Sequence, residues 1–259
     1  MLIENQLERT DHTHLGQIVT YAAGLEAKTI IWIASRFTEE HRAALDWLNE
    51  ITSEEFRFFG IAVEAWRIGD SAPAPRFHVI SSPNDWSRQV RSGAKQVESG
   101  ELTESKKLQL EFWTGFRDYA EEHARRFRPV KPAPQHWMVI AIGRTGFSLS
   151  AIASLTSSET GGFDQNELRA QLEINHPQHA DSAYRQLLEG REGIERELGE
   201  EAVWYEKDGV RQRRISLIRT ADLRKREEWP EYYRWLTEKL DRLHKVLHGR
   251  VKSLVLGDG

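Results

Sequence analysis

A nearly continuous apolar run at residues 29–34, Thr-Ile-Ile-Trp-Ile-Ala, places the strongest constraint on the fold of this chain. A strand buried on both faces of a parallel sheet needs such a run. Helical patterns flank it: one is capped by Asp11 or Thr13 and ends at Gly24, and the next is capped by Thr38. Strand candidates at residues 2–7, 56–68 and 76–80 complete the series. This order of strands and helices predicts an α/β domain with a mixed sheet and right-handed crossovers.

The second half of the chain has a different pattern. We expect helices at 108–127, 184–198 and 229–251, and strands at 136–142, 147–155, 168–174, 203–206 and 213–218. Turn signals at residues 143–146 and at Asp208-Gly209 join neighbouring strands as hairpins. These signals predict an α+β domain with an antiparallel sheet and a long C-terminal helix. The expected division is 1–86 for the first domain, 87–104 for a polar linker and 105–259 for the second domain.

Composition excludes several kinds of site. The chain has no cysteine, so disulfides, thiolate metal sites and cysteine nucleophiles are excluded. It shows no signal-peptide pattern and no apolar stretch of about 18 residues, so we expect a cytoplasmic protein without membrane contact. The formal net charge is -4, and residues 1–104 hold 10 basic and 16 acidic side chains. A nucleic-acid surface would therefore be local rather than global.

Glu4 and Gln6 form a candidate site near the start of the chain. Side chains alternate along a strand, so these two project from one face. Gln17 and Tyr21 lie four residues apart on the following helix and share a face of it. Mg²⁺ prefers oxygen ligands, and phosphodiester hydrolases use it to orient water and offset charge on the phosphate. This arrangement can present the carboxylate of Glu4 and the polar side chain of Gln6 to one Mg²⁺.

The residues around this site resemble a known family. Ile-Glu-Asn-Gln-Leu-Glu-Arg-Thr-Asp-His at 3–12, Thr-Tyr-Ala-Ala-Gly at 20–24 and the apolar run resemble the restriction-endonuclease-like domain of prokaryotic proteins in the PD-(D/E)XK superfamily. Residues 104–254 resemble a domain of unknown function that is commonly attached behind it, through the pattern Ile-Glu-x-x-Leu-Gly at 194–199 and Trp204.

The resemblance implies a role for each matching residue. Glu4 matches the acidic metal ligand, Gln6 stands where lysine is usual, and Gln17 and Tyr21 match a Gln-x-x-x-Tyr motif near the site or the DNA. Two features depart from the family. Glutamine cannot act as a proton donor as lysine does, and the preceding strand that carries the motif's aspartate has no counterpart. We therefore expect a truncated piece that begins inside the central strand.

Two further groups of residues are candidates for binding. His12 and His14 could converge on a metal, but residues near a helix start more often act as caps or face solvent. Arg211, Arg213 and Arg214 belong to the densest basic region and are the predicted nucleic-acid contacts. Alternation would place Arg214 on the opposite side of the strand, so a solvated sheet edge is the competing interpretation.

The sequence thus predicts a DNA-binding protein of the PD-(D/E)XK superfamily, of a defence or restriction type, that is inactive as this piece. Hydrolysis with Mg²⁺ would require the missing upstream strand. The alternative is a non-catalytic interaction protein in which the degenerate nuclease fold is a scaffold and the long final helix mediates homodimer formation.

Overall fold

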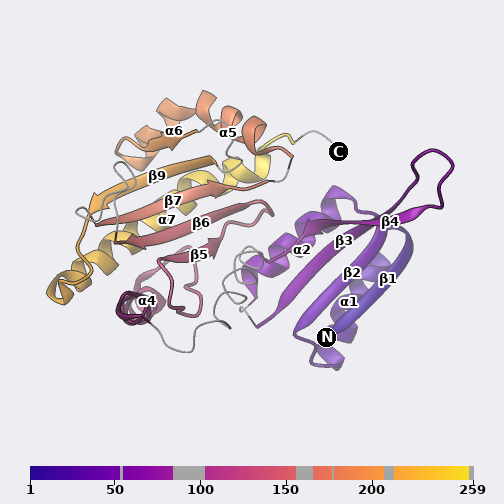
Figure 1. Cartoon of the computed structure of the whole chain (residues 1–259), viewed down its shortest axis with the longest axis horizontal. Helices are drawn as coiled ribbons and strands as arrows, with labels where there is room; N and C mark the ends of the chain where they lie inside the picture. Colours follow the sequence, from indigo (N-terminus) through magenta and orange to yellow (C-terminus); the bar gives the residue numbers. More distant parts are fainter. Residues whose placement is uncertain (53–54, 84–102, 156–165, 177, 207–212, 257–259) are drawn as a thin grey trace. The chain divides into compact units, whose positions relative to one another are not determined.

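The computed structural model describes residues 1–52, 55–83, 103–155, 166–176, 178–206 and 213–256 (Figure 1). The chain divides into two units. Unit 1 comprises residues 1–86 with 143–145, and unit 2 comprises residues 87–142 with 146–259. Most of the predicted linker at 87–104 lies outside the described residues, and its last residue, Glu104, begins a helix.

Unit 1 is built on a mixed sheet of strand order β1-β2-β3-β4, as the sequence predicts. The first three strands are parallel, and β4 is antiparallel to β3. The elements are β1 Leu2–Arg9, α1 His12–Gly24, β2 Thr29–Arg36, α2 Glu39–Ile51, β3 Arg57–Trp66 and β4 Ala74–Ser81. Within the described residues β1 lies at an edge of this sheet, and its place as the central strand of a longer sheet stays a prediction.

The two helices of unit 1 share one face of the sheet. Asp11 caps α1 and Thr38 caps α2, each through a side-chain oxygen that accepts a backbone N–H of the first turn. Ile18 of α1 and Leu45 of α2 join three strand residues in the buried core, which consists of Ile18, Ile30, Trp32, Leu45 and Phe58. A Cβ on Gly60 of β3 would lie 2.9 Å from Leu45 Cδ1, so a larger residue at this position would require the Leu45 side chain to shift.

The other face of this sheet is also apolar but is much less buried. Cross-strand neighbours form two rows, Ile3–Ile31–Phe59 and Ile33–Ile61–Val79. Ile3 and Val79 are 46% and 42% exposed, and Phe77, opposite Val63, is 63% exposed. Phe59 is buried, and we call the other seven residues the open apolar face. The sequence predicts that β2 is buried on both faces. In the described residues this is wrong, because only the side chains on the helix side of β2 are fully buried.

Unit 2 contains an antiparallel sheet of order β5-β6-β7-β9-β8, as predicted. Its helices include the long C-terminal helix α7. The elements are α4 Glu104–His123, β5 Trp137–Ala141, β6 Phe147–Ser154, β7 Glu167–Ile174, α5 Ala180–Glu189, α6 Arg191–Leu198, β8 Val203–Tyr205, β9 Arg213–Thr220, the 3-10 helix η1 Arg226–Glu228 and α7 Trp229–Ser253. The helix expected at 184–198 is in fact two helices that meet at Gly190.

Helix α7 runs across the sheet and supplies much of the core of unit 2 (Figure 1). Its buried apolar residues are Trp229, Tyr232, Tyr233, Leu236, Leu240, Leu243, Val246, Leu247 and Val251. The apolar stripe of α7 is therefore used inside its own unit. Homodimer formation through the final helix stays a prediction, and it would have to use other residues of α7. None of the helices in the described ranges is long and apolar enough to cross a membrane.

Candidate functional site

The candidate site lies where the parallel strands β1 and β2 end and the helices α1 and α2 begin. Gln6 is its centre and is only 7% exposed. Its Nε2 donates to the carbonyl oxygen of Arg9 at 2.8 Å and to Asp11 Oδ2 at 2.8 Å. Its Oε1 accepts from Trp32 Nε1 at 3.2 Å. Both amide N–H groups and the amide oxygen of Gln6 are therefore used in holding the end of β1 to β2 and to the start of α1.

Asp11 receives several hydrogen bonds at once. The backbone N–H of His14 donates to Asp11 Oδ1 at 2.8 Å, and the ring Nδ1 of His14 lies 2.8 Å from Oδ2. These bonds from His14, the backbone bond first, lower the pKa of Asp11 to about 2. The carboxylate is thus ionised throughout the neutral range, and it is partly satisfied as the cap of α1.

His41 forms a second, buried part of the site. Its Nδ1 lies 2.9 Å from Thr10 Oγ1 and 2.8 Å from Thr38 Oγ1, while its Nε2 lies 3.0 Å from His12 Nδ1. Burial, followed by the charge of His12, lowers the pKa of His41, so the ring is neutral near pH 7. A neutral imidazole donates at one nitrogen and accepts at the other. His41 therefore connects the end of β1 with the first residues of both helices. We call Gln6, Thr10, Asp11, His12, His14 and His41 the carboxyl-edge cluster.

The structure separates the predicted catalytic residues into two groups. Glu4 and Gln6 point to the helix side of β1, in register with Trp32 and Ala34, and Glu4 is half-buried. Gln17 and Tyr21 lie on the exposed surface of α1, and Tyr21 is 49% exposed. Within the described residues, no hydrogen bond joins Gln17 or Tyr21 to Glu4 or Gln6. A joint role of these four residues remains a prediction, as does Mg²⁺ binding by Glu4.

Two arginines stand beside the cluster. Arg9 and Arg36 are cross-strand partners at the carboxyl ends of β1 and β2, and both are exposed. The backbone N–H of Thr10 donates to the carbonyl oxygen of Arg36 at 2.9 Å, which fixes the two strand ends together. In open α/β sheets this edge is the usual place for ligands. The pair offers two positive charges at one end of the unit 1 sheet.

The predicted arginine contacts of unit 2 have other partners. Arg213 is buried and pairs with Asp181 at 2.8 Å and with Glu206 at 4.0 Å. The Arg214 guanidinium lies 4.1 Å from the centre of the Tyr205 ring. Arg211 lies outside the described residues. Two carboxylates thus occupy Arg213, and a phosphate contact there would have to displace them. DNA contact at these arginines stays a prediction.

Sequence reasoning did not find the connected cluster. The sequence predicts Asp11 only as a helix cap, favours capping or solvent exposure over metal binding for His12 and His14, and gives His41 no role. The missing information is long-range, because Thr10 and His41 lie 31 residues apart. A usable signal was present nonetheless. A threonine directly after a strand and a histidine on an otherwise apolar helix face are both polar residues in positions that burial disfavours unless they are paired.

Comparison with known proteins assigns the second half of the chain. A family described as a domain of unknown function, DUF4268, matches residues 108–251. The matched range includes every strand of the unit 2 sheet and most of α4 and α7. Neither the curated proteins nor the solved structures contain a match to this chain. The match agrees with the resemblance of residues 104–254 to a domain of unknown function. The chain therefore belongs to the DUF4268 family.

Proposed function

We propose that this chain binds DNA through unit 1, as a PD-(D/E)XK nuclease-like protein in which phosphodiester hydrolysis is weak or absent. The observation that carries the proposal is the pair of exposed arginines, Arg9 and Arg36, beside the carboxyl-edge cluster. Guanidinium groups bind phosphate oxygens in a fork, and two of them at the ends of adjacent strands match a charged backbone. The sequence resemblance at residues 3–24 supports the same assignment.

The position of Gln6 argues against efficient hydrolysis. The resemblance places a lysine here, but the Gln6 amide is neutral, buried and bonded to Trp32, Arg9 and Asp11. It therefore acts as a structural link and cannot supply a proton to a reaction. Glu4 is then the one anionic group among the four predicted catalytic residues. Mg²⁺ gives up its waters reluctantly unless several carboxylates and a substrate phosphate compensate, so one carboxylate makes a weak site.

DNA binding tests the proposal directly. We expect the full chain to bind a short fluorescent duplex at low salt, with an affinity that falls steeply between about 50 and 200 mM salt. Arg9→Ala and Arg36→Ala should each weaken binding for all sequences and reduce the slope of log K against log salt by about one. Arg57→Ala is the matched control, because it removes the same charge from the opposite end of the same sheet.

The outcomes separate binding from catalysis. The same preparation, incubated with plasmid and Mg²⁺ or Mn²⁺, should leave the plasmid intact, and Glu4→Ala should change nothing. Strong cleavage that disappears in Glu4→Ala would show that the given chain is sufficient for hydrolysis and that Gln6 does not limit it. An equal loss of affinity in Arg57→Ala would reject a specific role for Arg9 and Arg36.

A second candidate function is a non-catalytic interaction protein, and the open apolar face favours it. Contiguous exposed apolar patches on soluble proteins commonly mark contact surfaces. On this view the nuclease-like sheet is a scaffold, and the partner covers Ile3, Phe77 and Val79. This function gains if the parent chain shows no salt-dependent DNA binding while its mass in solution rises with concentration.

A further inference from the structure

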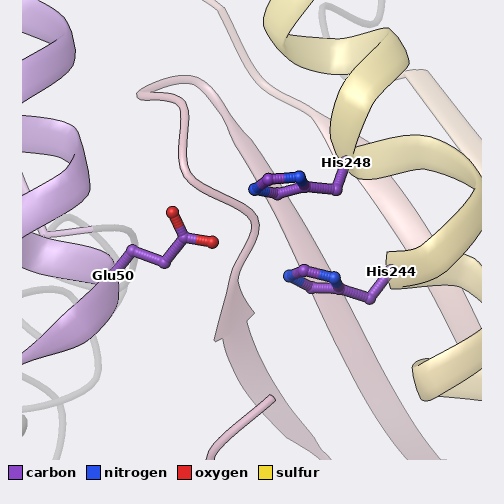
Figure 2. A group of neighbouring side chains, drawn as sticks. All are labelled: Glu50, His244 and His248. Carbon is purple, nitrogen blue, oxygen red and sulfur yellow. The ribbon is translucent and has the colours of Figure 1, made fainter. Parts of the chain in front are cut away.

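Two histidines stand one turn apart on α7. His244 and His248 project in the same direction from consecutive turns, as Figure 2 shows. Their ring centres are 4.8 Å apart and their planes differ by 18°. Each offers one ring nitrogen, and these two nitrogens lie within 4.8 Å of each other. Glu50, also drawn in Figure 2, belongs to unit 1 and is not part of this histidine pair.

The helix holds both histidines firmly in place. Leu243 and Leu247, the residues immediately before them, are fully buried in the core of unit 2. Arg242 Nη1 donates to the carbonyl oxygen of Leu198 at 2.8 Å, and Arg250 pairs with Glu197 at 2.6 Å. This segment of α7 is therefore fixed on both sides of the pair. The two imidazoles are half-buried, so little side-chain freedom is lost when they act together.

This spacing suits a particular class of ion. Imidazole nitrogens are good ligands for Zn²⁺, Ni²⁺ and Cu²⁺, whereas Mg²⁺ and Ca²⁺ prefer oxygen. Metal–nitrogen bonds of about 2.0–2.1 Å bring two ligating nitrogens to roughly 3 Å from each other, which small rotations of the two side chains achieve. Residues four apart on a helix share a face, so both can reach one ion. Water can complete the coordination.

We propose that His244 and His248 form a binding site for a late first-row divalent cation on α7. The site lies in the DUF4268 domain and is independent of the DNA-binding proposal for unit 1. It needs no change in the fold, because both ligands come from one rigid helix.

Calorimetric titration of the full, untagged, metal-free chain tests this site. NiCl₂ and ZnCl₂ are the probes. We expect one cation per chain, and we expect His244→Ala and His248→Ala each to weaken binding by about tenfold or more. The second imidazole binds intramolecularly once the first is engaged, and either substitution removes that advantage. Ni²⁺ should also raise the melting temperature of the parent and leave both variants unchanged.

The matched control is His123→Ala, which removes an exposed histidine from α4 in the same unit and should leave binding intact. Circular dichroism in EDTA confirms that each variant folds; His244→Gln and His248→Gln replace any alanine variant that does not. The proposal is overturned if the parent shows no saturable binding, if the variants bind like the parent, or if His123→Ala is equally impaired.

Discussion

At the scale of single residues, Asp11 joins three functions in one carboxylate: it caps α1, holds the His14 ring and accepts from Gln6. Its pKa is lowered to about 2, so its stabilising effect is complete above the unfolded value of about 3.9 and is lost as the pH falls through about 2. Asp11→Asn should remove this contribution to the pH dependence of the free energy of unfolding. Carbon-detected NMR measures the pKa of the Asp11 carboxyl. Urea unfolding between these pH values measures how the free energy of unfolding depends on pH.

The control for this prediction is Asp70→Asn, which changes an exposed aspartate in the β3–β4 turn. That variant should keep the acid dependence of the parent. If the Asp11 carboxyl instead titrates near its unfolded value, the bonds from His14 do not persist in solution and the geometry of the carboxyl-edge cluster is wrong.

At the scale of elements, the contact between α4 and α7 leaves no room for a side chain at Gly115. A Cβ there would lie 2.9 Å from Tyr233 Cζ, and the Tyr233 ring is buried. Alanine normally stabilises a helix relative to glycine by about 0.5–1 kcal/mol. Gly115→Ala should instead destabilise unit 2 by about 1–3 kcal/mol, because the clash outweighs propensity. Urea unfolding measures the difference.

Gly249→Ala makes the same substitution on α7, where a Cβ meets nothing within 4 Å. It should therefore be neutral or stabilising by up to about 1 kcal/mol. Equal effects of the two substitutions would mean that α4 and α7 are not packed as described.

The elements themselves were largely predictable from local signals. Apolar patterns, the caps Asp11 and Thr38 and the turn at residues 143–146 located most helices and strands to within a few residues, while the predicted Asp208-Gly209 turn lies outside the described residues. The break at Gly190 was missed because a single glycine is tolerated inside a helical pattern. The edge position of β1 and the bonds of Gln6 were out of reach for another reason. They depend on lateral strand order and on Trp32, which lies 26 residues away.

At the scale of the whole molecule, the two units have separate buried cores. Among the described residues, the core cluster of unit 1 has five members, whereas that of unit 2 draws on every described strand but β8 and on all four described α-helices. We expect two thermal transitions, with unit 1 unfolding first, because less apolar surface stabilises it. Ile18→Ala should reduce the free energy of unfolding of unit 1 by about 2–5 kcal/mol and so lower the temperature of the first transition alone. Leu172→Ala should lower the temperature of the second transition. Differential scanning calorimetry resolves both. A single transition that moves with either substitution would refute separate cores.

The place of α7 in the chain affects how the protein is made. A ribosome delivers all five strands of the unit 2 sheet before it reaches Trp229, yet α7 packs on β6 and β7 in the finished unit. The nascent sheet therefore lacks this helix until α7 has been synthesised, and until then Leu149, Ala170 and Leu172 can contact water or a neighbouring nascent chain. Ribosome-associated chaperones are expected to bind the exposed sheet before α7 packs on it. A premature stop codon within α7 would leave an aggregation-prone fragment.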